Sequence, residues 1–139
     1  MLQFLLDTEH FTLLEHGHPS VATRVASAPA GTVGISIVTA EESLRGRLSQ
    51  VARARTGAER VDRYRYFGNS LQLILTFSIA AFDDKAEAAF DSLRRTGLKC
   101  GFQDLKIAAI ALALPCTIIT RNKRDFSGIS GLQVDDWSV

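Results

Sequence analysis

The sequence predicts a three-layer α/β/α domain, in which helices cover both faces of a central, mostly parallel sheet of four to five strands. Short apolar, β-branched runs alternate with longer segments whose apolar residues recur at helical spacing, which is typical of this class. The 139 residues are 46% hydrophobic and 22% charged, a composition that suits one globular domain with a continuous core. Because the chain has no repeat, linker or low-complexity tract, we expect a single domain over residues 1–139.

The first part of the chain predicts a strand followed by two short helices. The strand is expected over Leu2–Leu6, and apolar side chains at helical spacing predict a helix from Thr8 onward. Gly17 and Pro19 interrupt this helix, and a second short helix is expected to end before Pro29.

The middle of the chain repeats the change from strand to helix. The β-branched run Val33–Val38 predicts the second strand, and Thr39 begins the following helix as the first residue of a capping box. Two long helices are expected up to about Leu75, divided near Thr56 and Gly57.

The last part of the chain predicts two further strands, an edge strand and two helices. A weak third strand is expected near Phe77–Ala80, with a helix from about Asp83 that stops at Gly97. An apolar helix then ends before Pro115. The run CTIIT predicts the fourth strand, RNKRDFSGISG a polar turn region, and LQV a short edge strand.

Composition also bears on where the protein acts. The longest unbroken apolar stretch, Ile107–Cys116, is half of the roughly 20 residues that a membrane span needs. The first residues do not resemble a secretory signal, since the apolar run meets Asp7 and no basic leader precedes it. Cys100 and Cys116 flank a predicted helix and lie too far apart for a disulfide. We therefore expect a cytoplasmic protein with free thiols and no membrane association.

Acidic and amide side chains gather where the predicted strands end. Because the strands are parallel, their carboxyl ends and the N-termini of the returning helices share one edge of the sheet. The residues that this rule brings to that edge are Asp7, Glu42, Asp104, Asn122 and Asp125.

Other interpretations of these residues stay open. Asp83 and Asp84 follow the weak third strand and belong to the same edge, so they are rivals. Asp7 suits a helix cap, and Thr39 with Glu42 suits a capping box. Asp104 suits the positive end of a helix, and Asn122 and Asp125 are ordinary turn residues. Only their convergence favours a functional site.

A cluster of carboxylates needs a cation. Two like charges ~4 Å apart repel by about 4 kcal/mol at an effective dielectric constant of ~20. Oxygen ligands of this kind suit Mg²⁺ or Mn²⁺, which also accept phosphate oxygens. The pattern therefore favours phosphoester chemistry.

Four short motifs in order resemble the PIN-domain family, most closely the VapC-like toxins of bacterial toxin–antitoxin pairs. FLLDT is similar to the opening strand of that family, SIVTAEESLRG to its second block, GFQDLKIAAIAL to its third and IITRNKRDF to its fourth. The closing GLQVDDW also fits, so the resemblance covers nearly the whole chain.

The resemblance implies a Mg²⁺-dependent ribonuclease in which water attacks an RNA phosphodiester in line. Asp7, Glu42 and Asp104 map to the metal ligands, with Glu41 the less favoured choice in the second block. Asn122 stands at the fourth, normally acidic position, and Asp125 is expected to compensate through water. The family also implies a homodimer inhibited by a VapB-like antitoxin.

Substrate contacts are expected beside these acids. The resemblance places Thr8 and Thr120 near the site, and three basic residues close to it are favoured as phosphate contacts: Arg121, Lys123 and Arg124. Seven arginines between Arg45 and Arg65 suit either an RNA-contacting ridge or a solvated helix face. Tyr64, Tyr66 and Phe67 suit base stacking or packing in a core or dimer interface.

Other functional classes are less favoured. A haloacid-dehalogenase-type phosphatase would have Asp where Glu9 stands, two residues after its nucleophile. SGISG is one residue short of the serine hydrolase motif. His16 and His18 suit zinc but lack partner ligands nearby. A non-catalytic PIN-like module that binds RNA or protein, and a housekeeping PIN nuclease without an antitoxin, remain as alternatives.

Overall fold

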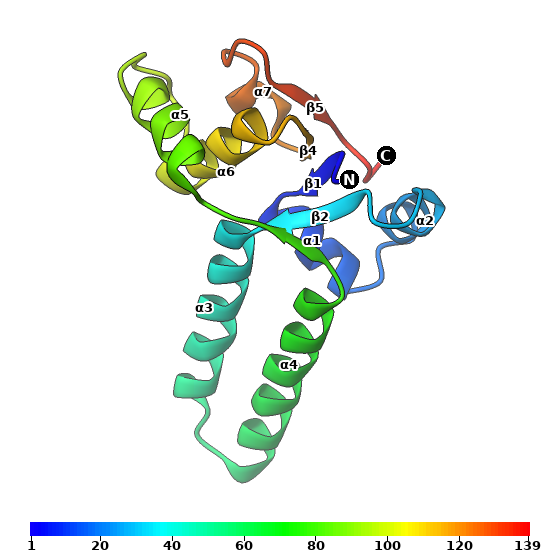
Figure 1. Ribbon diagram of the computed structural model, residues 1–139. Helices are drawn as coiled ribbons and strands as arrows, with labels where there is room; N and C mark the ends of the chain where they lie inside the picture. Colours follow the sequence, from blue (N-terminus) through cyan, green and yellow to red (C-terminus); the bar gives the residue numbers. More distant parts are fainter.

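The computed structural model describes all residues, 1–139, and contains one five-stranded parallel sheet with the strand order β3-β2-β1-β4-β5. Helices lie on both sides of the sheet, and the paired helices α3 and α4 extend away from it (Figure 1). The elements in chain order are β1 (Phe4–Leu6), α1 (Thr8–Glu15), α2 (Pro19–Ser27), β2 (Val33–Ser36), α3 (Ile37–Arg53), α4 (Gly57–Leu75), β3 (Ser78–Ala80), α5 (Asp84–Arg94), α6 (Phe102–Ala113), β4 (Thr117–Ile119), α7 (Lys123–Phe126) and β5 (Gln133–Asp135). The predicted α/β class and the parallel sheet are confirmed.

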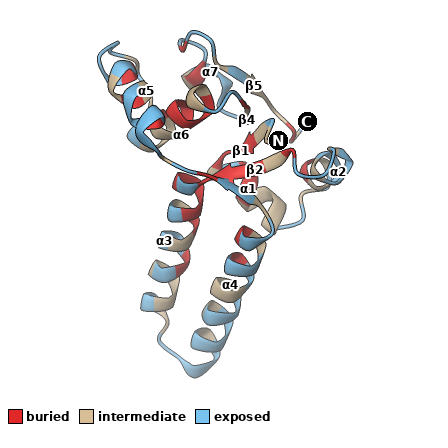
Figure 2. Cartoon of the chain, viewed as in Figure 1, coloured by how far each residue is buried: buried red, intermediate tan, exposed pale blue.

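The two faces of the sheet bury different side chains of the same strands. Leu5 and Ile118 lie in a cluster with α5 and α6, whereas Leu6, Ile35 and Ile119 lie in a second cluster with residues of α1, α3 and α4. Successive strand residues point to opposite faces, so strands buried on both sides consist of continuous apolar runs. Figure 2 shows the buried residues around the sheet and the exposed far half of the α3–α4 hairpin.

The start of α3 differs from the prediction. The second strand ends at Ser36 rather than Val38, and the helix begins at Ile37 rather than Thr39. Ser36 is the N-cap, since its side chain accepts a hydrogen bond from the N–H of Thr39 at 3.0 Å. The predicted capping box of Thr39 and Glu42 is therefore wrong, and both residues lie inside the helix. A capping serine outweighed the β-branched pattern of the two residues after it.

The polar segment after β4 also differs in detail. One short helix, α7, occupies part of the region predicted as turns. Phe126 at its end is buried and packs in the α6 cluster, which explains why this segment folds back onto the domain. No helix in the structure combines the length and apolarity that crossing a membrane requires.

Gly34 in β2 has no side chain, and this leaves room for Leu2 and for the backbone of β3. A Cβ atom there would lie 2.5 Å from Leu2 Cδ2 and 2.6 Å from the backbone oxygen of Ser78 in β3. We expect Gly34→Ala to lower the free energy of unfolding by about 2–3 kcal/mol, because the backbone of β3 cannot move aside without breaking its pairing. Urea unfolding measures the change.

Gly46 in α3 provides the matched control. No atom lies within 4 Å of a Cβ built there, so Gly46→Ala is expected to raise the free energy of unfolding by about 1 kcal/mol. Equal stability of Gly34→Ala and the wild-type protein would contradict the close β2–β3 approach.

Candidate functional site

The candidate site lies at the carboxyl edge of the sheet, near β1. The chain proceeds from β1 to β2 and β3 on one side and returns to β4 and β5 on the other. The strand order reverses at this switch point between β1 and β4, and ligands of open α/β sheets bind in the crevice outside the carboxyl ends of the strands at such a point. Asp7 directly follows β1, and its N–H donates to the carbonyl of Ile119 in β4 at 3.0 Å.

Asp7 caps α1 and still keeps an oxygen free. Its Oδ1 accepts a hydrogen bond from the N–H of His10 at 2.8 Å, so the capping interpretation is confirmed. No hydrogen bond uses Oδ2, and the residue is 7% exposed. The Asp7 carboxylate therefore caps α1 with Oδ1, and Oδ2 remains available to bind a ligand.

Glu42 is held next to the start of α1. Thr8 Oγ1 donates a hydrogen bond of 2.6 Å to Glu42 Oε1 and lies 3.3 Å from Thr39 Oγ1. Glu41 instead contacts Arg45 and accepts a hydrogen bond from Gln103 at 3.2 Å on the exposed surface. The structure thus joins Glu42 to the residues around Asp7 and gives Glu41 other partners.

The carboxyl of Asp104 has a raised pKa because it is partly buried near other acids. It lies in the first turn of α6, whose N-cap, Gly101, provides no side-chain cap. Burial and the charges of Asp7, Glu42 and Asp125 raise the pKa of its carboxyl from 3.8 to about 6. Three carboxylates from other segments are therefore close enough to disfavour the ionised form of Asp104.

Asp125 belongs to this group through charge, and Asn122 orients it. Asn122 Nδ2 donates a 2.7 Å hydrogen bond to Asp125 Oδ2. Burial together with the charges of Asp104 and Asp125 raises the pKa of the Cys100 thiol to about 11. The side-chain nitrogen of Asn122 is a donor here, so this residue holds an acid in place while adding no charge itself.

The carboxylates are near one another without surrounding a common point. No group of three or more aspartate, glutamate, histidine or cysteine side chains has the geometry of ligands around one ion. Asp83 and Asp84 contribute nothing to the shift at Asp104, and Asp83 instead caps α5 through the N–H of Ala86 at 3.0 Å. The two rivals from the sequence thus stand apart from the acidic group.

The predicted substrate contacts fall into two kinds. Thr120 is fully buried, and its Oγ1 accepts a hydrogen bond from the N–H of Asn122 at 2.9 Å, so it supports the turn. Arg121, Lys123 and Arg124 are exposed, and Arg121 Nε donates to Ser138 Oγ at 2.9 Å. Of the seven arginines in the basic segment, Arg47 is buried and does not belong to an exposed ridge.

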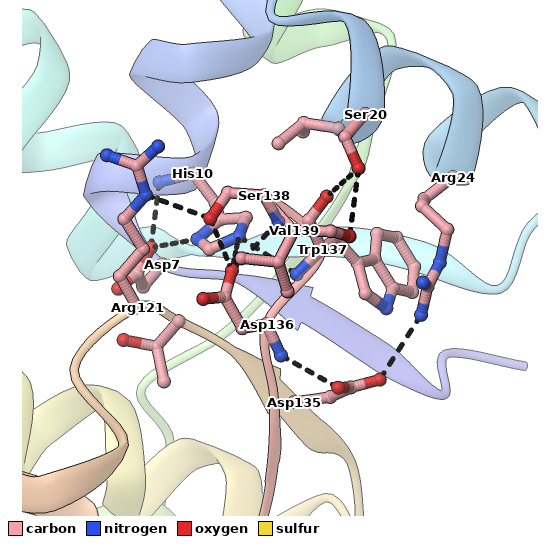
Figure 3. A network of polar contacts seen from close by, with 12 residues as sticks. Asp7, His10, Ser20, Arg24, Arg121, Asp135, Asp136, Trp137, Ser138 and Val139 are labelled. Atoms are coloured by element: carbon pink, nitrogen blue, oxygen red, sulfur yellow. Dashed lines mark hydrogen bonds and ion pairs between the residues drawn. The ribbon is translucent and has the colours of Figure 1, made fainter.

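Two residues at the site, His10 and Asp136, were not predicted from the sequence. His10 is fully buried on α1, with Nδ1 3.3 Å from Asp7 Oδ1 and Nε2 3.3 Å from Asp136 Oδ1 (Figure 3). Asp136 follows β5, and the rule that collected the other acids points to it as well. The signal for His10 was a polar residue three positions after Asp7, next to the buried Phe11.

Comparisons with known proteins identify the fold. The sequence matches no protein-family model and no curated protein. The structure is similar to a chain of the DNA-bound VapBC complex from Salmonella typhimurium, with a TM-score of 0.83, 24% identity and 99% of each chain covered. It is also similar to VapBC-1 from nontypeable Haemophilus influenzae, with a TM-score of 0.79, 22% identity, and 99% of this chain and 100% of that chain covered.

A third similar structure has a different name. FitAcB from Neisseria gonorrhoeae matches with a TM-score of 0.71 and 25% identity over 96% of this chain and 97% of that one. These similarities extend over nearly the whole length of all three chains. The protein therefore has the VapC-like PIN-domain fold that its four sequence motifs predicted.

Proposed function

We propose that this protein is a Mg²⁺- or Mn²⁺-dependent ribonuclease and the toxin of a VapBC-type pair. The observation that carries the proposal is the proximity of four carboxylates, from the end of β1 and from α3, α6 and α7, at the carboxyl edge of a VapC-like sheet. Burial, together with the charges of Asp7, Glu42 and Asp125, raises the pKa of Asp104 to about 6, and a bound cation would offset this cost of keeping Asp104 ionised.

The donor set fits a hard divalent cation. Asp7, Glu42 and Asp104 offer only oxygen atoms, and Asp125 adds a further negative charge that acts on Asp104. When bound, such an ion would lower the pKa of a coordinated water and offset charge that develops on phosphate. Because no three ligands surround one point, ion binding requires side chains of this group to turn toward one another.

The residues around the acids have separable roles in this proposal. Thr8 orients Glu42, and Asn122 orients Asp125. Arg121, Lys123 and Arg124 are exposed beside the same edge and would hold RNA phosphates. Contacts of this kind grip the backbone and carry no base preference.

Partners are proposed from the similar structures. The similar structures are those of VapBC and FitAcB complexes, which supports a VapB-like antitoxin as the partner of this protein. A homodimer and a cytoplasmic location complete the proposal, and the two free cysteines suit a reducing compartment.

The proposal is tested by RNA cleavage with Asp7→Asn. Cleavage of a mixed RNA substrate is expected in Mg²⁺ or Mn²⁺ and not in EDTA, and Asp7→Asn is expected to slow it at least about 100-fold. Asparagine caps a helix as well as aspartate does, so the substitution removes charge and keeps α1. Gel analysis of the RNA fragments measures the rate.

Asp83→Asn is the matched control. Asp83 is also an N-cap aspartate after a strand of the same sheet, yet it stands outside the acidic group, so full cleavage is expected. Cleavage in EDTA, or full cleavage by Asp7→Asn, would overturn the nuclease proposal.

A non-catalytic RNA-binding module is the second candidate. It is favoured by the neutral Asn122 at the fourth acidic position and by the lack of three converging ligands. RNA binding by the wild-type protein without cleavage in either metal would establish it.

A further inference from the structure

His10 stands between the first proposed metal ligand and the C-terminal segment. Its imidazole is fully buried, with Nδ1 3.3 Å from Asp7 Oδ1 and Nε2 3.3 Å from Asp136 Oδ1 (Figure 3). We propose that His10 is a positioning residue that fixes the carboxylate of Asp7 so that Oδ2 faces the other acids. This inference rests on the proposed metal-dependent function.

The contacts of His10 indicate that Nδ1 carries a hydrogen. The backbone N–H of Trp137 donates to Nε2 at 3.3 Å, which requires a lone pair on Nε2 and leaves the ring hydrogen on Nδ1. A doubly protonated ring, with Nε2–H directed at Asp136, also carries a hydrogen on Nδ1. In both forms the Nδ1–H lies close to Asp7 Oδ1, with the two heavy atoms 3.3 Å apart.

This N–H group has no other partner. Nδ1 of His10 is buried and makes no hydrogen bond, and Asp7 Oδ1 is the acid beside it. A buried donor without a partner is unfavourable, so a small turn of the Asp7 carboxylate toward Nδ1 is favoured and a turn away from His10 is disfavoured. With Oδ1 kept between the N–H of residue 10 and the imidazole, Oδ2 is the oxygen left for an ion.

The far side of the imidazole is anchored by the C-terminal segment. Asp136 Oδ1 accepts hydrogen bonds from Ser138 N at 2.8 Å and Ser138 Oγ at 2.6 Å. Burial alone would raise the pKa of Asp136, but these hydrogen bonds and the charges of His10 and Arg121 outweigh it and lower the pKa. Asp136 is therefore an ionised, fixed partner for the ring.

The buried Trp137 adds a second anchor. Its side chain packs in the cluster under α1, with the Phe4 ring 5.1 Å away, which holds the backbone N–H that donates to His10. The last residues of the chain thus reach Asp7 through one imidazole. Such outer partners of metal ligands typically change metal affinity when they are removed.

The test measures Mn²⁺ binding without RNA, by electron paramagnetic resonance of free Mn²⁺. His10→Phe keeps a ring of similar size and removes both nitrogens, and we expect about 10-fold weaker Mn²⁺ binding. His10→Asn places an amide N–H near the position of Nδ1 and is expected to restore most of the affinity. This rescue separates positioning of Asp7 from simple filling of the core.

Phe11→Leu is the matched control on the same helix. Phe11 is fully buried but packs in the apolar cluster away from the acids, so this variant is expected to lose stability and keep the Mn²⁺ affinity. An equal loss of affinity in Phe11→Leu and His10→Phe would overturn the inference, because destabilisation alone would then explain it.

Nitrogen-15 NMR of the wild-type protein tests the same contact without a substitution. We expect the His10 signals to show a hydrogen on Nδ1, and an unprotonated Nδ1 would overturn the inference. Equal Mn²⁺ affinity of wild-type and His10→Phe protein would overturn this inference alone. A wild-type protein that binds no Mn²⁺ would overturn the proposed function as well.

Discussion

Asp104→Asn is expected to abolish RNA cleavage and, in the absence of divalent cations, to stabilise the fold. The substitution removes one of three proposed metal ligands, so we expect a loss of at least about 100-fold in cleavage rate. It also removes a negative charge that is unfavourable in the folded protein, because burial and the charges of neighbouring acids raise the pKa of Asp104. Loss of activity together with gain of stability is what a strained functional site predicts.

The stabilisation depends on pH in a defined direction. The pKa of Asp104 is about 6 in the folded protein and 3.8 as its ordinary value, so the folded state binds more protons between these pH values. Stability from this group is present below about pH 4 and is lost as the pH rises through about 6. A pKa shift of this size corresponds to about 3 kcal/mol in the free energy of unfolding, and the partial exposure of Asp104 reduces this to about 1–2 kcal/mol.

Urea unfolding in EDTA at pH 4 and pH 8 measures this effect. The free energy of unfolding of Asp104→Asn should exceed that of the wild-type protein at pH 8 and approach it at pH 4. Asp62→Asn, at an exposed position of α4, is the control and should differ little at either pH.

Added Mg²⁺ should reverse the order at pH 8. A ligand that binds only the folded state stabilises it, and the wild-type protein should gain more than Asp104→Asn. If Asp104→Asn is less stable than the wild-type protein at pH 8 in EDTA, the carboxylate supports the fold and the acidic group is not strained.

Glu15→Gln is expected to lower the free energy of unfolding by about 3 kcal/mol. Glu15 Oε1 on α1 lies 3.8 Å from an Arg47 guanidinium nitrogen on α3, and their side chains are only 6% and 10% exposed. Ser70 on α4 donates to Glu15 Oε2 at 2.5 Å, so one carboxylate joins three helices. Neutralising it leaves the Arg47 charge buried without a counter-ion.

An apolar pair should recover most of this loss. Glu15 Oε1 and Arg47 Nε have no hydrogen-bond partner, so the pair is incompletely satisfied. The double variant Glu15→Leu with Arg47→Met removes both charges and is expected to unfold within about 1 kcal/mol of the wild-type protein. Circular dichroism during urea unfolding compares the variants.

Glu59→Gln is the control for this ion pair. Glu59 pairs with Arg63 along α4 at 3.6 Å, but both side chains are partly exposed, and a change of about 0.5 kcal/mol is expected. A loss at Glu15→Gln no larger than that at Glu59→Gln would show that the buried pair is not what ties the α3–α4 hairpin to α1.

The sequence by itself determined the succession of most strands and helices along the chain and the edge of the sheet to which Asp7, Glu42 and Asp104 belong. These features follow from local periodicity and from the rule that parallel strands end at one edge, so they need no knowledge of side-chain contacts. The exceptions were the short helix α7, in a segment predicted as turns, and the beginning of α3, where the capping hydrogen bond of Ser36 outweighed the β-branched pattern.

Only the tertiary structure decided which neighbours the acids have. Thr8 donates a hydrogen bond to Glu42 and not to Glu41, which distinguishes the two glutamates. Folding also brings Asp136 next to the His10 ring, although the two residues are 126 positions apart in the sequence. Such contacts depend on how far each helix turns and packs against the sheet. Sequence spacing sets the period of a helix, whereas packing of the whole core sets its rotation and position.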